Sequence, residues 1–192
     1  MDKITRFLKE VDMQSKTKVL MIVAFENFRD EEFSESFNAY KNAGIDVTVA
    51  SIRKGTAVGM FGTEIEIGTT LDEVRESDFD AVVFIGGMGT PSVRSNRRAV
   101  EIAKNSVDRK VLAAICWAPT ILAKAGVVNG RKVTVWNGDD AEYGTTTGKV
   151  MENAGAKFID EPVVTDGNII TGNGPAAAAG FAKAVIAKLN EK

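Results

Sequence analysis

The stretch VLAAICWAPTILAKAG, residues 111–126, has the pattern of a strand, a tight turn and a helix in immediate succession. Residues 111–115 are continuously apolar, which is typical of a strand covered on both faces of a parallel sheet. The helix is predicted from Pro119 to Ala125 and stops near Gly126. Cys116 is therefore expected at the carboxyl end of the strand, where open α/β sheets carry their functional groups.

The same alternation of strands and helices continues on both sides of this stretch. Apolar runs predict further strands over 19–24, 46–51, 81–85 and 132–136. Helices are predicted over 31–43, 96–107, 149–154 and 176–189. Turn residues predict hairpins within 54–68 and across 163–171. The pattern indicates an α/β fold, with a doubly wound, mainly parallel sheet, helices on both faces and small β-hairpin additions.

The length of 192 residues suits one ordinary domain. We expect a single domain over 17–192, preceded by an N-terminal helical extension over 1–16. The extension is predicted from an apolar stripe at helical spacing, made of Ile4, Phe7, Leu8 and Val11. Such a helix either packs on its own domain or contacts a second copy of the chain.

Charge and composition exclude several classes of protein. The 24 basic and 26 acidic side chains leave a formal net charge of −2, which argues against nucleic acid as the main partner. The chain has no apolar run of about 18 residues, so no membrane span is expected. Its first residues lack the apolar core of a secretion signal, so we expect a cytoplasmic protein.

The chain contains a single cysteine, Cys116, and no histidine. No intrachain disulfide, cysteine-based zinc site, Cys-His pair or Ser-His-Asp triad can form from these residues. We therefore expect neither a metal nor a cofactor. Any catalysis depends on thiol, carboxyl, hydroxyl, amine and backbone groups.

Cys116 has the surroundings of a nucleophile at a strand-to-helix elbow. Small residues, Ala114 and Ala118, stand two positions before and after it, as a strained turn requires. The start of a helix favours a thiolate, and the backbone N–H of Trp117 is a natural oxyanion donor. The alternative is a small buried cysteine that closes a strand.

Other candidate residues follow neighbouring strands. Gly86 and Gly87 come directly after the strand over 81–85. Without side chains they allow a close approach of their backbone, and they are candidates to supply a second oxyanion N–H. The acidic run Asp30-Glu31-Glu32 follows the first strand, and one of its glutamates is a candidate to face the crevice. The spacing does not say which.

Four residues at or after strand ends are candidates for the lining of the pocket. They are Gly86 and, at the end of the strand over 132–136 or after it, Trp136, Asp139 and Asp140. Either aspartate is also a candidate carboxylate in place of the missing histidine, although solvated turn acids are common. Trp117 is interpreted as a bulky wall that narrows the choice of substrate.

Together these motifs resemble the ThiJ/PfpI superfamily, the flavodoxin-like relatives of class I glutamine amidotransferases. The resemblance extends from about Lys18 to Leu189. It rests on residues 27–32, Gly86-Gly87, the elbow over 114–119 and residues 172–175, in this order.

The resemblance implies roles for particular residues. Cys116 matches the elbow cysteine, Glu32 the glutamate that hydrogen-bonds its sulfur, and the N–H groups of Gly87 and Trp117 the oxyanion donors. It also implies a homodimer or a larger homo-oligomer. Protease-like members and many glyoxalase-like members have a histidine after the cysteine or near it, whereas Trp117 stands next to the cysteine here.

Three functions follow as hypotheses. The first is a cofactor-free, cysteine-dependent enzyme for small reactive carbonyls, a glyoxalase- or deglycase-like lyase or hydrolase that uses Cys116 and Glu32. The second is a non-enzymatic stress-responsive protein with Cys116 as an oxidation sensor. The third is a cysteine peptidase or amidase, which the absence of histidine disfavours.

Overall fold

The structure, a computed structural model, describes residues 16–109 and 111–191. The helical extension predicted for residues 1–16 lies outside the described residues, apart from Lys16. None of the described helices is long and apolar enough to cross a membrane.

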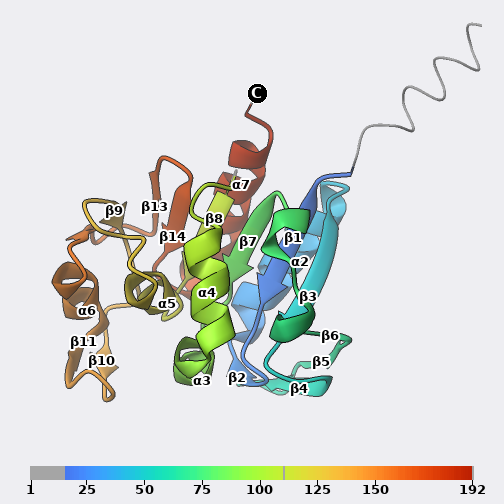
Figure 1. Ribbon diagram of the computed structural model, residues 1–192, viewed down its shortest axis with the longest axis horizontal. Coiled ribbons are helices and arrows are strands. Elements are labelled where there is room, and N and C mark those ends of the chain that lie inside the picture. Colours follow the sequence, from blue (N-terminus) through green and yellow to red (C-terminus); the bar gives the residue numbers. More distant parts are fainter. Residues whose placement is uncertain (1–15, 110, 192) are drawn as a thin grey trace, which may run out of the picture.

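A seven-stranded sheet forms the centre of the described chain (Figure 1). Its strands, in spatial order, are β13 (Val163–Asp166), β14 (Ile169–Gly172), β8 (Val111–Ile115), β7 (Ala81–Phe84), β1 (Lys18–Ile22), β3 (Asp46–Ser51) and β6 (Thr69–Thr70). All neighbouring pairs are parallel except β13 and β14, which form the predicted antiparallel hairpin. The mainly parallel sheet that the apolar runs predict is confirmed.

Helices cover both faces of this sheet (Figure 1). On one face α2 (Asp30–Asn42) packs against α7 (Ala178–Leu189). On the other face lie α3 (Thr90–Ser95), α4 (Arg97–Asn105) and α5 (Pro119–Lys124), and α6 (Thr147–Asn153) packs beside α5. Single 3-10 turns occupy Leu71–Glu73, Glu76–Asp78 and Pro175–Ala177.

Three small sheets complete the fold. They are β2 (Glu26–Phe28) with β4 (Gly55–Gly59) and β5 (Glu64–Ile67), then β9 (Lys132–Val133) with β12 (Lys157–Phe158), and β10 (Asp139–Asp140) with β11 (Thr145–Thr146). The β4–β5 pair is the hairpin predicted within 54–68. The β2–β4–β5 sheet lies beyond the carboxyl ends of the central strands, at the lower edge of Figure 1.

The structure corrects one sequence-based boundary and adds one helix. The strand expected over 132–136 ends at Val133 because the amides that follow bond to other partners: Thr134 N–H donates to Thr171 Oγ1 at 2.8 Å, and Trp136 N–H donates to the Cys116 carbonyl at 2.8 Å. The short helix α3 was not predicted. It precedes α4, which lies within the range of the helix expected over 96–107.

The core consists of the central strands and the helix faces that cover them. Every residue of β7 and β8 is buried, as their continuous apolar sequence requires. Because β1, β7 and β8 are parallel neighbours, the loops that follow them meet at one edge of the sheet. This edge holds the start of α2 with Glu32 and the turns with Gly86 and Cys116.

Candidate active site

Cys116 occupies a strained turn directly after β8. Its φ of 62° lies in the left-handed region, which residues other than glycine rarely adopt. The backbone is held on both sides: the Cys116 N–H donates to the Gly172 carbonyl at 2.8 Å, and the Cys116 carbonyl accepts the Trp136 N–H at 2.8 Å. The structure therefore maintains a conformation that would otherwise relax, as at a nucleophile elbow.

Gly86 and Gly87 lie where no side chain fits. A Cβ atom on Gly86 would be 2.6 Å from the Cβ of Cys116, and one on Gly87 would be 2.5 Å from the Arg29 nitrogen. Gly87 also has a φ of 116°, which favours glycine. The glycines thus bring the backbone after β7 against both the elbow and the loop that precedes α2.

Glu32 is the member of the acidic run that reaches the elbow. It is fully buried in the first turn of α2, and its Oε2 accepts the Gly86 N–H at 3.1 Å. Its Oε1 is buried with no hydrogen-bond partner among the described residues. Burial raises the pKa of Glu32 to about 7, against the opposing effects of the Cys116 thiol and the Gly86 N–H.

The other two acids of the run have structural contacts. Asp30 accepts the N–H groups of Phe61, at 2.9 Å, and Thr63, at 2.8 Å, which ties the β4–β5 turn to the start of α2. Glu31 forms a surface ion pair with Arg29 at 2.8 Å. The tertiary structure thus separates three adjacent carboxyl groups that the sequence leaves equivalent.

The Cys116 thiol is 9% exposed, and its acidity depends on Glu32. Burial raises the pKa of the thiol, the charge of ionised Glu32 raises it further, and the backbone N–H groups of Gly87 and Trp117 act against both effects. The start of the helix therefore does not by itself favour a thiolate, contrary to our expectation. When Glu32 is protonated, its repulsion disappears and its O–H becomes a donor toward sulfur, so the pair titrates as a unit.

A cavity of about 490 Å³ opens above the thiol. It is lined by Arg29, Met60, Gly87, Met88, Cys116, Trp117, Trp136 and Pro175. The two tryptophan rings pack with their centroids 5.4 Å apart. The wall is mostly apolar, and such a cavity suits a small ligand with few polar groups.

Three of the predicted pocket residues do not line this cavity. Gly86 lies beneath it, between Glu32 and Cys116, and Asp139 is exposed elsewhere. Asp140 is 1% exposed and accepts hydrogen bonds from Trp117 Nε1, at 2.8 Å, and from Arg94. Its carboxylate is directed into this buried network, not toward the thiol.

Four of the residues that line the cavity are ones singled out from the sequence, namely Gly87, Cys116, Trp117 and Trp136. Sequence reasoning missed Arg94 and the other half of the cavity wall. Arg94 is fully buried, yet nothing in residues 91–96 indicates a partner for a buried cation. Met60 and Met88 stand in loops without periodicity. Such positions depend on contacts between distant segments, which local patterns do not encode.

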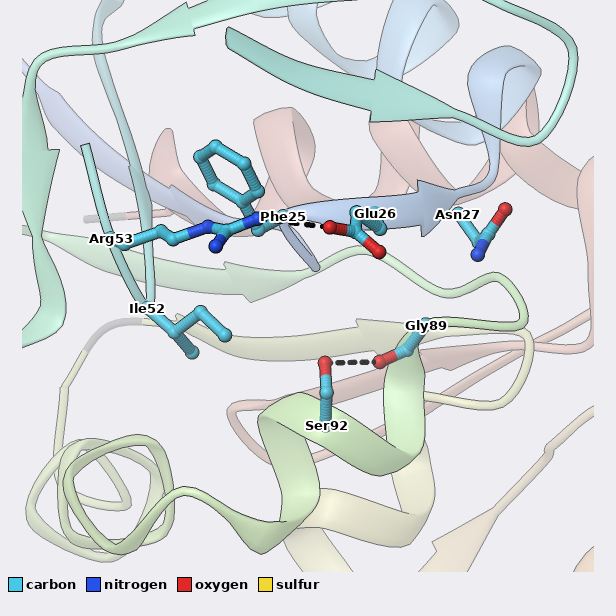
Figure 2. A pocket seen from close by; sticks show the side chains of 7 residues that line it. All are labelled: Phe25, Glu26, Asn27, Ile52, Arg53, Gly89 and Ser92. Carbon is cyan, nitrogen blue, oxygen red and sulfur yellow. Dashed lines mark hydrogen bonds and ion pairs between the residues drawn. The ribbon is translucent and has the colours of Figure 1, made fainter. Parts of the chain in front are cut away.

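A second cavity, of about 320 Å³, is lined by residues 25–27 after β1 together with Ile52, Arg53, Gly89 and Ser92 (Figure 2). Its charged side chains pair with one another: Arg53 forms an ion pair with Glu26 at 2.9 Å and stacks over the Phe25 ring at 4.0 Å. Ser92 donates to the Gly89 carbonyl at 2.7 Å. The cavity with Cys116 is therefore the better candidate for chemistry.

Within the described ranges, no cluster of three or more histidine, cysteine, aspartate or glutamate side chains could hold a metal ion. The expectation that no cofactor is needed stays a prediction.

Comparisons with known proteins agree on one family. The sequence model of the DJ-1/PfpI family matches residues 17–188. The chain is 39% identical to deglycase PfpI of Pyrococcus furiosus over 161 residues, which are 82% of this chain and 90% of that protein. It is 35% identical to general stress protein 18 of Bacillus subtilis over 179 residues, 91% of this chain and 99% of that protein.

A solved structure is similar over nearly the whole chain. The crystal structure of a ThiJ/PfpI domain protein from Brachyspira murdochii matches with a TM-score of 0.82 and 34% sequence identity. The match covers 92% of this chain and 98% of that one.

Proposed function

The chain belongs to the DJ-1/PfpI family, and we propose that it is an enzyme that converts small reactive carbonyl compounds with a Cys116–Glu32 pair. The observation that carries the proposal is the contact between these two groups. A thiol on a strained elbow stands beside a buried carboxyl group whose pKa is about 7. The similarity to a protein named deglycase supports an enzymatic function.

The pair supplies both groups that the conversion of an α-oxoaldehyde requires, a nucleophile and an acid. With its proton on Glu32 the pair contains a thiolate, which is the nucleophile, and a neutral carboxyl group, which is the acid. A carboxyl group with a pKa near 7 gives and takes protons at neutral pH. The backbone N–H groups of Gly87 and Trp117 flank the sulfur and stabilise negative charge on a substrate oxygen.

Methylglyoxal illustrates the sequence of steps. The sulfur of Cys116 bonds to the aldehyde carbon, and the aldehyde oxygen takes the proton of Glu32, which gives a hemithioacetal. The ionised Glu32 then removes the hydrogen of that carbon as a proton, and the electron pair moves into a carbon–carbon double bond. The ketone oxygen becomes an oxyanion.

The second half of the reaction returns the proton. Glu32 protonates the second carbon, and the hydroxyl proton of the first carbon moves to the second oxygen, which leaves a lactoyl thioester on Cys116. Water cleaves the carbon–sulfur bond and regenerates the thiol. The sum is methylglyoxal plus water to lactic acid, with no external oxidant or reductant.

The test compares methylglyoxal consumption and lactate release in wild type, Cys116→Ser and Glu32→Gln. We expect methylglyoxal consumption and lactate release to be lost in both variants. The control is Glu31→Gln, at the exposed neighbour that pairs with Arg29, and its rates stay near those of wild type. A Cys116→Ser protein that consumes methylglyoxal at the wild-type rate overturns the proposal.

A second candidate function is oxidation sensing. The buried Oε1 of Glu32, which has no hydrogen-bond partner among the described residues, favours it, because a hydroxyl on an oxidised Cys116 sulfur could donate to this carboxyl group. The thiolate attacks hydrogen peroxide, an S–O bond forms as the O–O bond breaks, and hydroxide leaves. Mass spectrometry after mild peroxide treatment distinguishes the two functions, because a thiol that stays unmodified excludes the sensor.

The homodimer or larger assembly that the family resemblance implies stays a prediction. Phe61 and Met88 are each 66% exposed near the mouth of the cavity, which is unusual for large apolar side chains. Sedimentation velocity measures the assembly directly.

A further inference from the structure

Trp117, the residue after the nucleophile, is held at two separate points. Its indole Nε1–H donates to Asp140 Oδ2 at 2.8 Å. Its backbone carbonyl accepts the hydroxyl of Thr120 at 2.8 Å. The side chain and the main chain of this residue are thus each fixed by a hydrogen bond.

Both points lead to one buried arginine. Arg94, on α3, is fully buried and donates to both carboxylate oxygens of Asp140, with 3.0 Å between Nη2 and Oδ1. The same guanidinium donates from Nη1 to Thr120 Oγ1 at 3.0 Å. Glu142 accepts from its outer edge, at 2.6 Å from Nη2, and the ring of Tyr143 packs over it at 4.6 Å.

The charges of this network are internally balanced. Burial acts to raise the pKa of Asp140, but hydrogen bonds from Arg94 and Trp117 keep it below its usual value. The carboxylate is therefore ionised and paired at neutral pH. An indole N–H only donates a hydrogen bond and does not take up or release a proton near neutral pH. The network therefore holds Trp117 in place and transfers no proton.

We propose that Arg94, Asp140 and Thr120 are positioning residues that clamp Trp117 and thereby limit the access of bulky molecules to Cys116. The proposal rests on the proposed function, because it names the residues that would set which carbonyl substrates reach the thiol.

The clamp affects selectivity because Trp117 is a wall of the cavity and a neighbour of the sulfur. Its ring lines the cavity and packs on Trp136, and its backbone N–H is directed at the thiol. A ring fixed by a hydrogen bond to a buried ion pair cannot swing aside without breaking that bond. Loss of that bond is therefore expected to increase the access of bulky molecules to the thiol more than the access of small ones.

The test removes the clamp and leaves Trp117 unchanged. In the double variant Arg94→Met/Asp140→Leu, apolar side chains replace the buried ion pair, a change that commonly preserves a fold. Thr120→Val removes only the hydroxyl with little change in shape, and Thr120→Ser restores it. Arg98→Met/Glu76→Leu is the matched control, because it removes another ion pair, of 2.6 Å, away from the elbow.

The readout is the rate of alkylation of Cys116 by iodoacetamide and by its larger analogue N-phenyl-iodoacetamide. We expect the alkylation rate with the larger reagent, divided by the rate with the smaller one, to rise by about tenfold in the double variant. Contacts in a pocket ordinarily supply discrimination of this size. Thr120→Val shifts the ratio in the same direction by a smaller factor. Thr120→Ser and the control pair retain the wild-type ratio.

An unchanged ratio in a folded double variant overturns the clamp. If the double variant does not fold, Thr120→Val against Thr120→Ser decides: a raised ratio supports the clamp and equal ratios overturn it. A lower melting temperature alone does not change the ratio, which separates positioning from stability. The assay needs no carbonyl turnover, so its result is independent of the methylglyoxal test of the proposed function.

Discussion

Gly86 lies so close to Cys116 that a Cβ atom on the glycine would stand 2.6 Å from the Cβ of the cysteine. The same atom would be 2.9 Å from Glu32 Oε2, so the thiol and the carboxyl group meet across a bare backbone. The contact between the two reactive groups therefore depends on a residue without a side chain.

Gly86→Ala is expected to separate the pair. The added methyl group forces the elbow or α2 to shift, and overpacking of this kind costs about 1–3 kcal/mol of unfolding free energy. Chemical denaturation measures the loss, and iodoacetamide measures the change in thiol reactivity. Gly68→Ala is the control, since no atom lies within 4 Å of its added Cβ, and an equal effect there contradicts the explanation.

Glu32 is expected to make stability depend on pH. Its pKa is raised from 4.5 to about 7, so the folded state binds the proton more tightly than the unfolded chain does. The resulting stability is fully present below about pH 4.5 and is lost as pH rises through about 7, in total about 3 kcal/mol. Denaturation of wild type and Glu32→Gln across this window measures it. A variant that retains the whole slope contradicts the assignment.

Glu32→Gln is also expected to make the thiol more acidic while it abolishes turnover. Ionised Glu32 raises the pKa of Cys116, and a neutral amide does not. The high-pH limb of the iodoacetamide rate profile should therefore move to lower pH in the variant. Movement to higher pH would show that Glu32 acts on the thiol only as a hydrogen-bond donor.

Asp30 is expected to hold the β4–β5 turn. Asp30→Ala leaves the N–H groups of Phe61 and Thr63 without their acceptor, which costs about 1–3 kcal/mol. Hydrogen exchange should accelerate at these two amides. Glu31→Ala removes only a surface ion pair and should cost roughly 0–1 kcal/mol.

Arg94 alone is expected to be far more costly to remove than the pair. Arg94→Met leaves the buried carboxylate of Asp140 without its cation, a loss of about 3–5 kcal/mol. The double variant Arg94→Met/Asp140→Leu should recover most of this loss. A thermodynamic cycle of the single and double variants measures the recovery, and additive losses would argue against a coupled pair.

The central fold was predictable because its signals are local. A strand buried on both faces needs a continuous apolar run, and residues 19–22, 81–84 and 111–115 provide one. Their alternation with helices implies parallel neighbours, and parallel strands bring their carboxyl ends to one edge. Small residues on both sides of Cys116 likewise indicate a sharp elbow without knowledge of any distant contact.

The errors depend on contacts between distant segments. The strand over 132–136 is apolar enough to pair throughout, but after Val133 its amides bond to Thr171 and to the Cys116 carbonyl. The burial of Arg94 is compensated by Asp140, Thr120 and Glu142, which come from other segments of the chain. No periodicity in one segment reports a partner in another.

The sequence by itself determined the α/β class, the position of the elbow and the exclusion of histidine chemistry, because composition and short-range pattern are sufficient for each. The residue pattern left open which carboxyl group faces the thiol, only the family resemblance named Glu32, and the tertiary structure supplies the physical reason. Asp30, Glu31 and Glu32 are adjacent and chemically alike, but the orientation of α2 directs them to a hairpin, to the surface and to Cys116. That orientation depends on how the helix packs on the sheet, and packing is a property of the whole chain.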